Sequence, residues 1–254
     1  MRGVEDREKI QEALDYLCDW ADSWGMAFNY SKCKVMHVGR KNPKYDYFMR
    51  GTKVSTTDEE RDVGVLISSN LKPSAQCTKA AGMAMSVLNQ LRRNFHYRDR
   101  HTFLRLYKQY VRPHLEFSSP AWSPWLIGDR EALEKVQEKA VKMVTGLKGT
   151  NYEERCLELG LETLQRRRER QDMAMVHKYT AKENQSLFTM ASEDGARTRR
   201  TAGAKCVVAQ YARTDIRKHS FAVRAVESWN RLPNSIRAES RPERFKQRLK
   251  LDKS

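Results

Sequence analysis

The sequence predicts an α+β protein that is predominantly helical. Apolar residues recur every three or four positions along most of the chain, whereas short strand-like runs bounded by glycine occur only before residue 70. A chain of 254 residues is long enough to bury a sizeable core. We therefore expect a small β-containing region over residues 1–70, a helical region over 71–184, a basic linker over 185–205 and a basic helical region over 206–254.

The first expected element is a helix over Val4–Trp24, because apolar residues repeat at helical spacing and Gly25 follows. We expect its two tryptophans, Trp20 and Trp24, to pack in the core. The run Cys33–Val38 predicts a short strand.

Two further runs predict β-structure. Tyr45–Met49 and Thr52–Thr56 flank Arg50-Gly51, which is typical of a hairpin whose turn needs glycine. Val63–Ile67 predicts a buried strand, and Gly64 within it indicates a bulge or a close backbone approach.

Beyond Pro73 the pattern is helical, and capping residues or helix-ending residues mark most boundaries. The first three expected helices run from Cys77 to Phe95, from an Asp99 cap to Pro113 and from an Asp129 cap to Gly146. The next two run from an Asn151–Glu154 capping box to Gly160 and from Thr163 to about Lys182. The last two cover Ser220–Asn230 and a stretch from a Ser240–Glu243 cap through Leu249.

The charge of the chain is strongly positive. It has 48 Lys+Arg against 32 Asp+Glu, a formal net charge of +16, and residues 195–254 alone contain 16 basic and 5 acidic groups. Such an excess favours a polyanionic partner. Nucleic acid is the first expectation, and an anionic membrane surface is the second.

Cysteine usage and hydropathy indicate an intracellular protein, in the nucleus or the cytoplasm. The five cysteines are widely spaced, and no CxxC pair or histidine pattern suggests a metal site, so reduced thiols are expected and a structural zinc site is the alternative. No apolar run approaches the ~18–20 residues of a membrane-spanning helix. The charged start of the sequence does not resemble a signal peptide.

Catalytic motifs are missing from the sequence. It contains no GxxxxGK[ST] loop, no GxSxG and no HExxH. Polymerases need two carboxylates to hold two divalent metals. Adjacent aspartates are the usual sequence sign of that site in reverse transcriptases, and this chain has no Asp-Asp pair.

Six blocks, taken in order, resemble the carboxy-terminal part of jockey-like non-LTR (LINE) retrotransposon reverse transcriptases. They are WADSWGMAFNYSKCKVMHVGR, RDVGVLISSNLKPSAQC, LYKQYVRPHLEFSSPAW, LEKVQEKAVKMVTG, YEERCLELGLETLQRRR and FAVRAVESWNRLP. The resemblance implies the end of a palm with a primer-grip hairpin, followed by a helical thumb and tail. It places the catalytic aspartates upstream of this chain. The expected function is therefore nucleic-acid binding without polymerisation, and no cofactor is expected, because the ligands for the magnesium of the parent enzymes are missing.

The resemblance and the charge pattern together suggest phosphate contacts with RNA, DNA or an RNA–DNA hybrid. The candidate residues are Lys32, Lys34, Gly64, Arg92, Arg93, Arg166, Arg167, Arg168, Arg170, Arg197, Arg199 and Arg200. Each has a structural alternative: the lysines and arginines as solvated side chains, and the glycine as an ordinary strand bulge.

Two other functional readings stay open at this point. The chain is either an inert relic that exposes former palm-facing apolar surface near Val35, Val63 and Leu66, or a helical module that binds another protein or dimerises.

Overall fold

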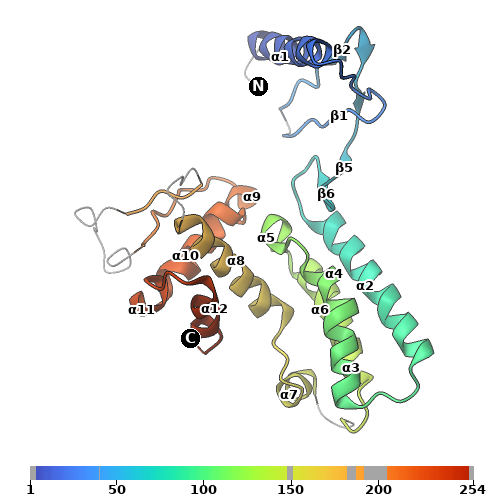
Figure 1. Ribbon diagram of the computed structural model, residues 1–254, viewed down its shortest axis with the longest axis vertical. Helices are drawn as coiled ribbons and strands as arrows, with labels where there is room; N and C mark the ends of the chain where they lie inside the picture. The colour runs from blue at the N-terminus through green and yellow to red at the C-terminus, as the bar shows by residue number, and fades with distance from the viewer. Residues whose placement is uncertain (1–3, 40, 148–150, 182–186, 192–204, 252–254) are drawn as a thin grey trace. The chain divides into compact units, whose positions relative to one another are not determined.

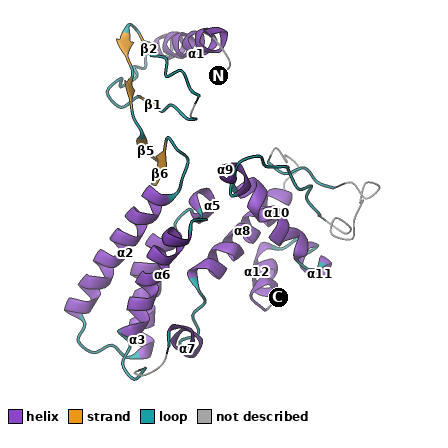
Figure 2. Ribbon diagram, turned by 180° about the vertical axis from the view of Figure 1, so that it is seen from behind, coloured by secondary structure: helices purple, strands orange, loops and turns teal. Residues whose placement is uncertain are grey.

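A computed structural model describes residues 4–39, 41–147, 151–181, 187–191 and 205–251. The chain divides into two compact units, Met1–Ala75 and Gln76–Ser254, which we call the N-terminal and the C-terminal unit. Most of the described residues are helical, and the strands that form pairs of two or more residues all precede helix α2 (Figures 1 and 2). The expected α+β class with predominant helix is confirmed.

In the N-terminal unit, helix α1 (Val4–Ser23) packs on strand β2 (Phe48–Met49). The Gln11 side chain fastens the two elements, because its amide donates to the Phe48 carbonyl oxygen at 2.8 Å and accepts from the Phe48 N–H at 3.0 Å. The core beneath is small and is formed by Cys18, Met49 and Val54.

The two tryptophans of the expected first helix, Trp20 in α1 and Trp24 in the turn after it, are not core residues, contrary to expectation. Trp20 is 44% and Trp24 69% exposed, with their rings 6.4 Å apart. The helix has two neighbouring stripes of apolar residues. The small core covers the stripe that contains Cys18 and Ala21, and leaves the tryptophan stripe on the surface.

The expected hairpin around Arg50-Gly51 is confirmed in shorter form. Strand β2 pairs antiparallel with β3 (Thr52–Lys53). Arg50 and Gly51 have φ of +47° and +72°, as a two-residue turn with both central residues left-handed requires. Strand β1 (Lys34–Val35) is shorter than the expected strand and pairs in parallel with β4 (Ser55–Thr56).

The prediction of a continuous strand over Val63–Ile67 is wrong at its start. Strands β5 (Glu59–Asp62) and β6 (Val65–Ser68) form an antiparallel hairpin, and Val63-Gly64 is its turn. Val63 has a φ of +43°, which is strained for a β-branched residue, and is 85% exposed. Gly64, at +89°, is thus a turn glycine and not a bulge.

Helix α2 (Ser74–Asn94) has most of the predicted buried face, made of residues spaced by three or four positions. These residues are Cys77, Ala80, Ala84, Leu88 and Leu91. Phe95, expected at the end of this face, lies just after the helix and is exposed.

Asp99 caps α3 (Arg100–Leu106) by accepting from the Thr102 N–H at 2.9 Å, as predicted. Pro113 does not end this helical stretch. A π-helical turn η1 (Tyr107–Val111) follows α3 directly and leads into α4 (Arg112–Glu116). Pro113 lies at the start of α4, a position where a missing N–H costs little.

The next helices are α5 (Ser119–Trp122) and α6 (Ile127–Lys142). Leu126 is the N-cap of α6, so the predicted Asp129 cap is wrong by one turn. Asp129 lies in the first turn, where a carboxylate favours the helix dipole.

The predicted capping box is confirmed at α7 (Tyr152–Glu158), where Asn151 and Glu154 exchange hydrogen bonds of 2.8 and 3.0 Å. Thr163 caps α8 (Leu164–Thr180), also as predicted.

The last helices are α9 (Asp215–Lys218), α10 (Phe221–Arg231), α11 (Asn234–Arg237) and α12 (Pro242–Leu251). Helices α10 and α12 both pack on α8 (Figure 1). Trp229 and Phe245 are fully buried between them.

The expected linker at 185–205 lies largely outside the described residues. One described position, Phe188, is buried in the same cluster as Trp229 and Val207, and Met190 forms a β-bridge with Val207. At least this part of the segment is therefore core and not linker.

Candidate nucleic-acid interface

The three candidates of the N-terminal unit lie on different elements. Lys32 is exposed in the turn before β1, and its N–H bonds the Asn29 carbonyl oxygen at 3.0 Å. The Lys34 ammonium donates to the Ser55 hydroxyl at 2.8 Å. Gly64 lies at the tip of the β5–β6 hairpin.

Arg92 and Arg93 are exposed in the last turn of α2 and form no ion pair with a described residue. Consecutive residues of a helix point about 100° apart, so the two side chains leave the helix in different directions. They can contact a phosphate backbone separately.

The arginine run on α8 is largely engaged within the protein. Arg167 forms two hydrogen bonds to the carboxylate of Glu116, and Arg170 donates to Glu162 at 2.8 Å. Arg168 is only 3% exposed. Arg166 alone of the four is exposed. The run wraps about the helix, so only some of its guanidinium groups face solvent, and the phosphate contacts expected of Arg167, Arg168 and Arg170 compete with their places inside the protein. Arg197, Arg199 and Arg200 lie outside the described residues.

Helix α12 is an exposed basic element that was not among the candidates. It contains four basic residues and one acidic residue, Glu243. Its basic residues are Arg244, Lys246, Arg248 and Lys250, and all four are exposed. The sequence signal is a pair of buried residues, Phe245 and Leu249, each flanked on both sides by basic residues.

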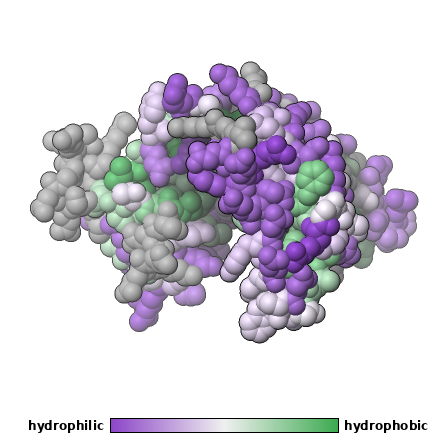
Figure 3. Space-filling model, turned by 90° about the horizontal axis from the view of Figure 1, so that it is seen from above, coloured by the Kyte–Doolittle hydropathy of each residue, from purple (hydrophilic) through white to green (hydrophobic). Residues whose placement is uncertain are grey.

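Hydrophilic side chains predominate on the described surface seen in Figure 3, with smaller apolar patches among them. Residues 205–251 contain twelve Lys+Arg and four Asp+Glu. Their net charge of +8 is half of the +16 of the whole sequence, even without residues 192–204.

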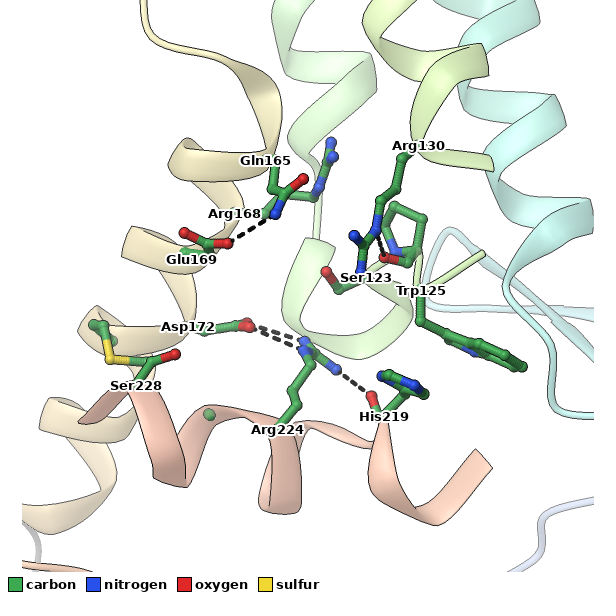
Figure 4. A pocket seen from close by; sticks show the side chains of 13 residues that line it. Ser123, Trp125, Arg130, Gln165, Arg168, Glu169, Asp172, His219, Arg224 and Ser228 are labelled. Carbon is green, nitrogen blue, oxygen red and sulfur yellow. Dashed lines mark hydrogen bonds and ion pairs between the residues drawn. The ribbon is translucent and has the colours of Figure 1, made fainter. Parts of the chain in front are cut away.

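The C-terminal unit also contains a cavity of about 160 Å³. Its wall is formed by α8, α10, the start of α6 and the segment before it (Figure 4). The charged residues that line it are Arg130, Arg168, Glu169, Asp172 and Arg224.

Arg224 and Asp172, which both line this cavity, form an ion pair. The guanidinium donates to both carboxylate oxygens, at 2.9 and 3.0 Å, and to the carbonyl oxygen of His219 at 2.9 Å (Figure 4). It also donates to the Pro120 carbonyl oxygen at 2.8 Å. Burial raises the pKa of Asp172, and Arg224 opposes that rise. The pair is therefore internally satisfied.

Arg168 differs from Arg224 because its two terminal nitrogens, Nη1 and Nη2, are buried without a hydrogen-bonding partner in the described structure. Burial lowers its pKa, and the carboxylate of Glu134 acts in the opposite direction. A buried guanidinium whose terminal nitrogens lack hydrogen bonds is costly to the fold.

Two aromatic rings stand beside this group of charges. The Trp125 and His219 rings stack with centroids 4.9 Å apart and planes inclined by 2°. Burial, followed by the charge of Lys218, lowers the pKa of His219. The stacked pair is thus a flat, neutral wall at physiological pH.

Among the described residues, no group of three or more His, Cys, Asp or Glu is placed to hold a metal ion. None of the described helices combines the length and apolar character needed to cross a bilayer. No protein family, curated protein or solved structure matches this chain.

Proposed function

We propose that this chain binds nucleic acid through the phosphate backbone and represents the carboxy-terminal part of a non-LTR retrotransposon reverse transcriptase. The observation that supports it best is the basic surface of α12, which has four exposed Lys and Arg residues in ten positions. Its site of action is within the cell, in the nucleus or the cytoplasm.

The geometry of α12 suits a backbone contact. Arg244 and Arg248 are one turn apart, as are Lys246 and Lys250, and the buried residues Phe245 and Leu249 separate the two pairs. Because the apolar face is anchored in the core, the basic side chains are held at the surface on both sides of it.

The basic groups of α12 are mostly uncommitted. Arg248 donates to the Ser235 carbonyl oxygen at 2.8 Å and lies 3.6 Å from a carboxylate oxygen of Glu239. Arg244, Lys246 and Lys250 form no ion pair with any residue in the described ranges. Such cations attract phosphates without reading the base sequence.

The proposed activity is binding and not polymerisation. Two-metal phosphoryl transfer needs paired carboxylates, and the sequence offers no adjacent aspartates. We therefore propose an RNA, DNA or hybrid ligand, with no metal cofactor of its own.

Fluorescence anisotropy across a salt series tests this proposal. The purified chain, freed of nucleic acid, is titrated into a labelled RNA–DNA hybrid, duplex DNA and heparin. We expect tighter binding to the hybrid than to heparin near physiological salt. Log affinity should fall on a log-salt axis by about 0.9 for each phosphate neutralised on duplex DNA. Equal, weak binding to all three that vanishes with salt would favour the inert-relic alternative.

A matched pair of triple variants locates the contact. The variant R244Q/K246Q/K250Q removes three charges from α12, and we expect it to reduce the salt slope by one or more contacts. The control R105Q/K135Q/K139Q removes three exposed charges from α3 and α6. An identical loss in both triples would contradict a contact located on α12.

A second candidate function is self-association through α1. One stripe of exposed apolar residues runs along α1 and into the turn after it, at successive intervals of seven, three and four residues: Ile10, Leu17, Trp20 and Trp24. Multi-angle light scattering after nuclease treatment tests it. A nuclease-resistant dimer that W20A/W24A converts to a monomer would support self-association, and a monomeric wild type would exclude it.

A further inference from the structure

The cavity beside α8 contains an unmatched positive charge. Arg168, Arg130 and Arg224 line it together with Glu169 and Asp172, so the lining residues include three guanidinium groups and two carboxylates. Arg224 neutralises Asp172 through two hydrogen bonds. The exposed Glu169 accepts from the Gln165 amide at 3.1 Å. Arg130 and Arg168 remain without an ion pair to a described residue.

The two remaining arginines come from different helices and lie near enough to repel each other. The charge of Arg130 is among the influences that lower the pKa of Arg168. Arg130 itself donates through Nε to the Pro124 carbonyl oxygen at 3.2 Å. An anion in the cavity that both arginines line would replace this repulsion by attraction. A small shift of the Arg168 side chain would bring its buried Nη1 and Nη2 within reach of that anion.

The two carboxylates whose charges raise the pKa of Arg168, those of Glu134 and Glu116, have other partners. Glu134 accepts from the Tyr152 hydroxyl and from the Leu164 N–H, and Glu116 is paired with Arg167 and Arg112. Neither forms a hydrogen bond with Arg168. The protein therefore supplies nearby negative charge but leaves the terminal nitrogens of this arginine unbound.

The cavity has room for one oxyanion. A water molecule occupies about 30 Å³ of liquid volume, so about 160 Å³ holds a group several times that size. Figure 4 shows the cavity bounded by α8, α10 and the segment that leads into α6, with Trp125 and His219 at one side. The stacked rings offer a flat surface next to the charge, as a nucleotide would need.

We propose that the cavity lined by Arg130 and Arg168 binds a single phosphate group of a nucleic-acid strand. The inference rests on the proposed nucleic-acid function and adds a defined phosphate site to it. The phosphate is either an internal phosphodiester or a terminal monoester. In both cases two of its oxygens accept from the guanidinium groups, and the adjoining nucleoside faces the Trp125–His219 wall.

Inorganic phosphate is the first probe. Thermal unfolding of the full chain is followed while phosphate replaces chloride at constant ionic strength and pH. We expect a melting temperature that rises with phosphate concentration and saturates in the wild type. R130Q and, separately, R168M should abolish the rise, and R105Q should retain it. R130Q keeps the test decisive if R168M does not fold. The proposal would be overturned if phosphate raised the melting temperature no more than chloride does, or if both cavity variants kept the full rise.

Oligonucleotides then distinguish the two phosphate sources. The wild type and R130Q are titrated with one single-stranded oligonucleotide carrying either a 5′-phosphate or a 5′-hydroxyl. A preference of several-fold for the 5′-phosphate that R130Q removes identifies a terminal monoester. Equal binding of both, weakened several-fold by R130Q, identifies an internal phosphodiester. Unchanged binding of both by R130Q contradicts the site.

The two proposals can fail separately. Loss of the phosphate effect with intact, α12-dependent strand binding would remove only the cavity site. A saturable phosphate effect without strand binding would remove the nucleic-acid function and leave a site for small phosphorylated ligands.

Discussion

At the scale of single residues, burial decides which polar groups of this protein are chemically available. Arg168 and Arg166 are two positions apart in one basic run, yet Arg168 is buried and Arg166 is exposed. The helical repeat of 3.6 residues makes such a difference inevitable once one face of α8 is covered. A basic run in the sequence is therefore not one functional unit.

The cysteine thiols provide a residue-scale prediction. Cys33 is half-buried, and the other four are buried. Burial raises the pKa of the Cys77 thiol to about 12, which leaves almost no thiolate at neutral pH. We expect Ellman's reagent to modify one thiol rapidly in the native protein and the rest only with unfolding. The variant C33S should remove the fast phase, and its survival in C33S would contradict the assignment.

The Asp99 cap gives a prediction of pH dependence. The hydrogen bond from the Thr102 N–H lowers the pKa of Asp99 below its ordinary value. A depressed carboxyl pKa stabilises the fold above the unfolded-state value, near 3.9, and this contribution is lost as pH falls through the folded-state pKa. D99A should therefore unfold at lower urea than the wild type at pH 7, and the difference should shrink as the pH is lowered below about 4.

D99N is the matched control for this experiment, because asparagine caps a helix without titrating. The difference between D99N and D99A should stay constant over the same pH range. A constant difference between the wild type and D99A would show that the ionised cap contributes nothing.

At the scale of elements, one buried side chain joins three helical segments. Gln137 of α6 accepts from the Tyr107 hydroxyl of η1 at 2.7 Å. Its amide donates to the Tyr152 hydroxyl of α7 at 2.9 Å and to the Glu162 carbonyl oxygen at 3.0 Å. All of its hydrogen-bonding atoms are thus used, and α6 is fixed in register against its neighbours.

The variant Q137L should be strongly destabilised. It has nearly the same volume but leaves the Tyr107 hydroxyl and the Glu162 carbonyl without their partner, at about 1–3 kcal/mol for each unsatisfied group. Urea unfolding followed by circular dichroism measures the loss. Q165L, at an exposed position of α8, serves as the control and should change stability by less than about 0.5 kcal/mol. Equal midpoints of Q137L and wild type would rule out a structural role for the network.

Both antiparallel hairpins of this chain are closed by turns that need positive φ angles. The hairpins of β2–β3 and β5–β6 each have a two-residue turn with both φ positive, at Arg50-Gly51 and Val63-Gly64. The first could be predicted from the sequence. The second was missed because Val63 is a strong strand former, and its hydrophobicity masked a turn that glycine at the next position allows.

At the scale of the whole molecule, each of the two compact units has its own core. The larger apolar core of the C-terminal region surrounds Trp229 and draws on α8, α10, α12 and the segments around Phe188 and Val207. The Trp229 indole N–H also donates to the Lys205 carbonyl oxygen at 2.7 Å. Its ring also lies beside the rings of His177 and Phe245, which are 68 positions apart, so this one side chain contacts distant parts of the chain.

W229A should lower the free energy of unfolding by about 3–5 kcal/mol, because it removes a fully buried aromatic ring and leaves a cavity. W24A is the matched control, since Trp24 is largely exposed. We expect W24A to have nearly the wild-type midpoint in urea. Comparable losses in both variants would mean that Trp24 is covered in solution, as self-association through α1 requires.

The amino-acid sequence by itself determined the helices and their boundaries where the signal is local. The Asp99, Asn151 and Thr163 caps and most of the buried face of α2 were predicted correctly. Each depends on residues within one or two helical turns, so the responsible side chains can be seen in one short window of sequence.

Only the tertiary structure decided which faces are covered and which charges remain free. Arg167 is engaged by Glu116, 51 positions away, and the tryptophan stripe of α1 is left exposed because the small core covers its neighbour. The cavity of Arg130, Arg168 and Arg224 likewise joins side chains that are up to 94 positions apart. Contacts of this kind depend on how distant helices pack, and no local pattern in the sequence specifies that packing.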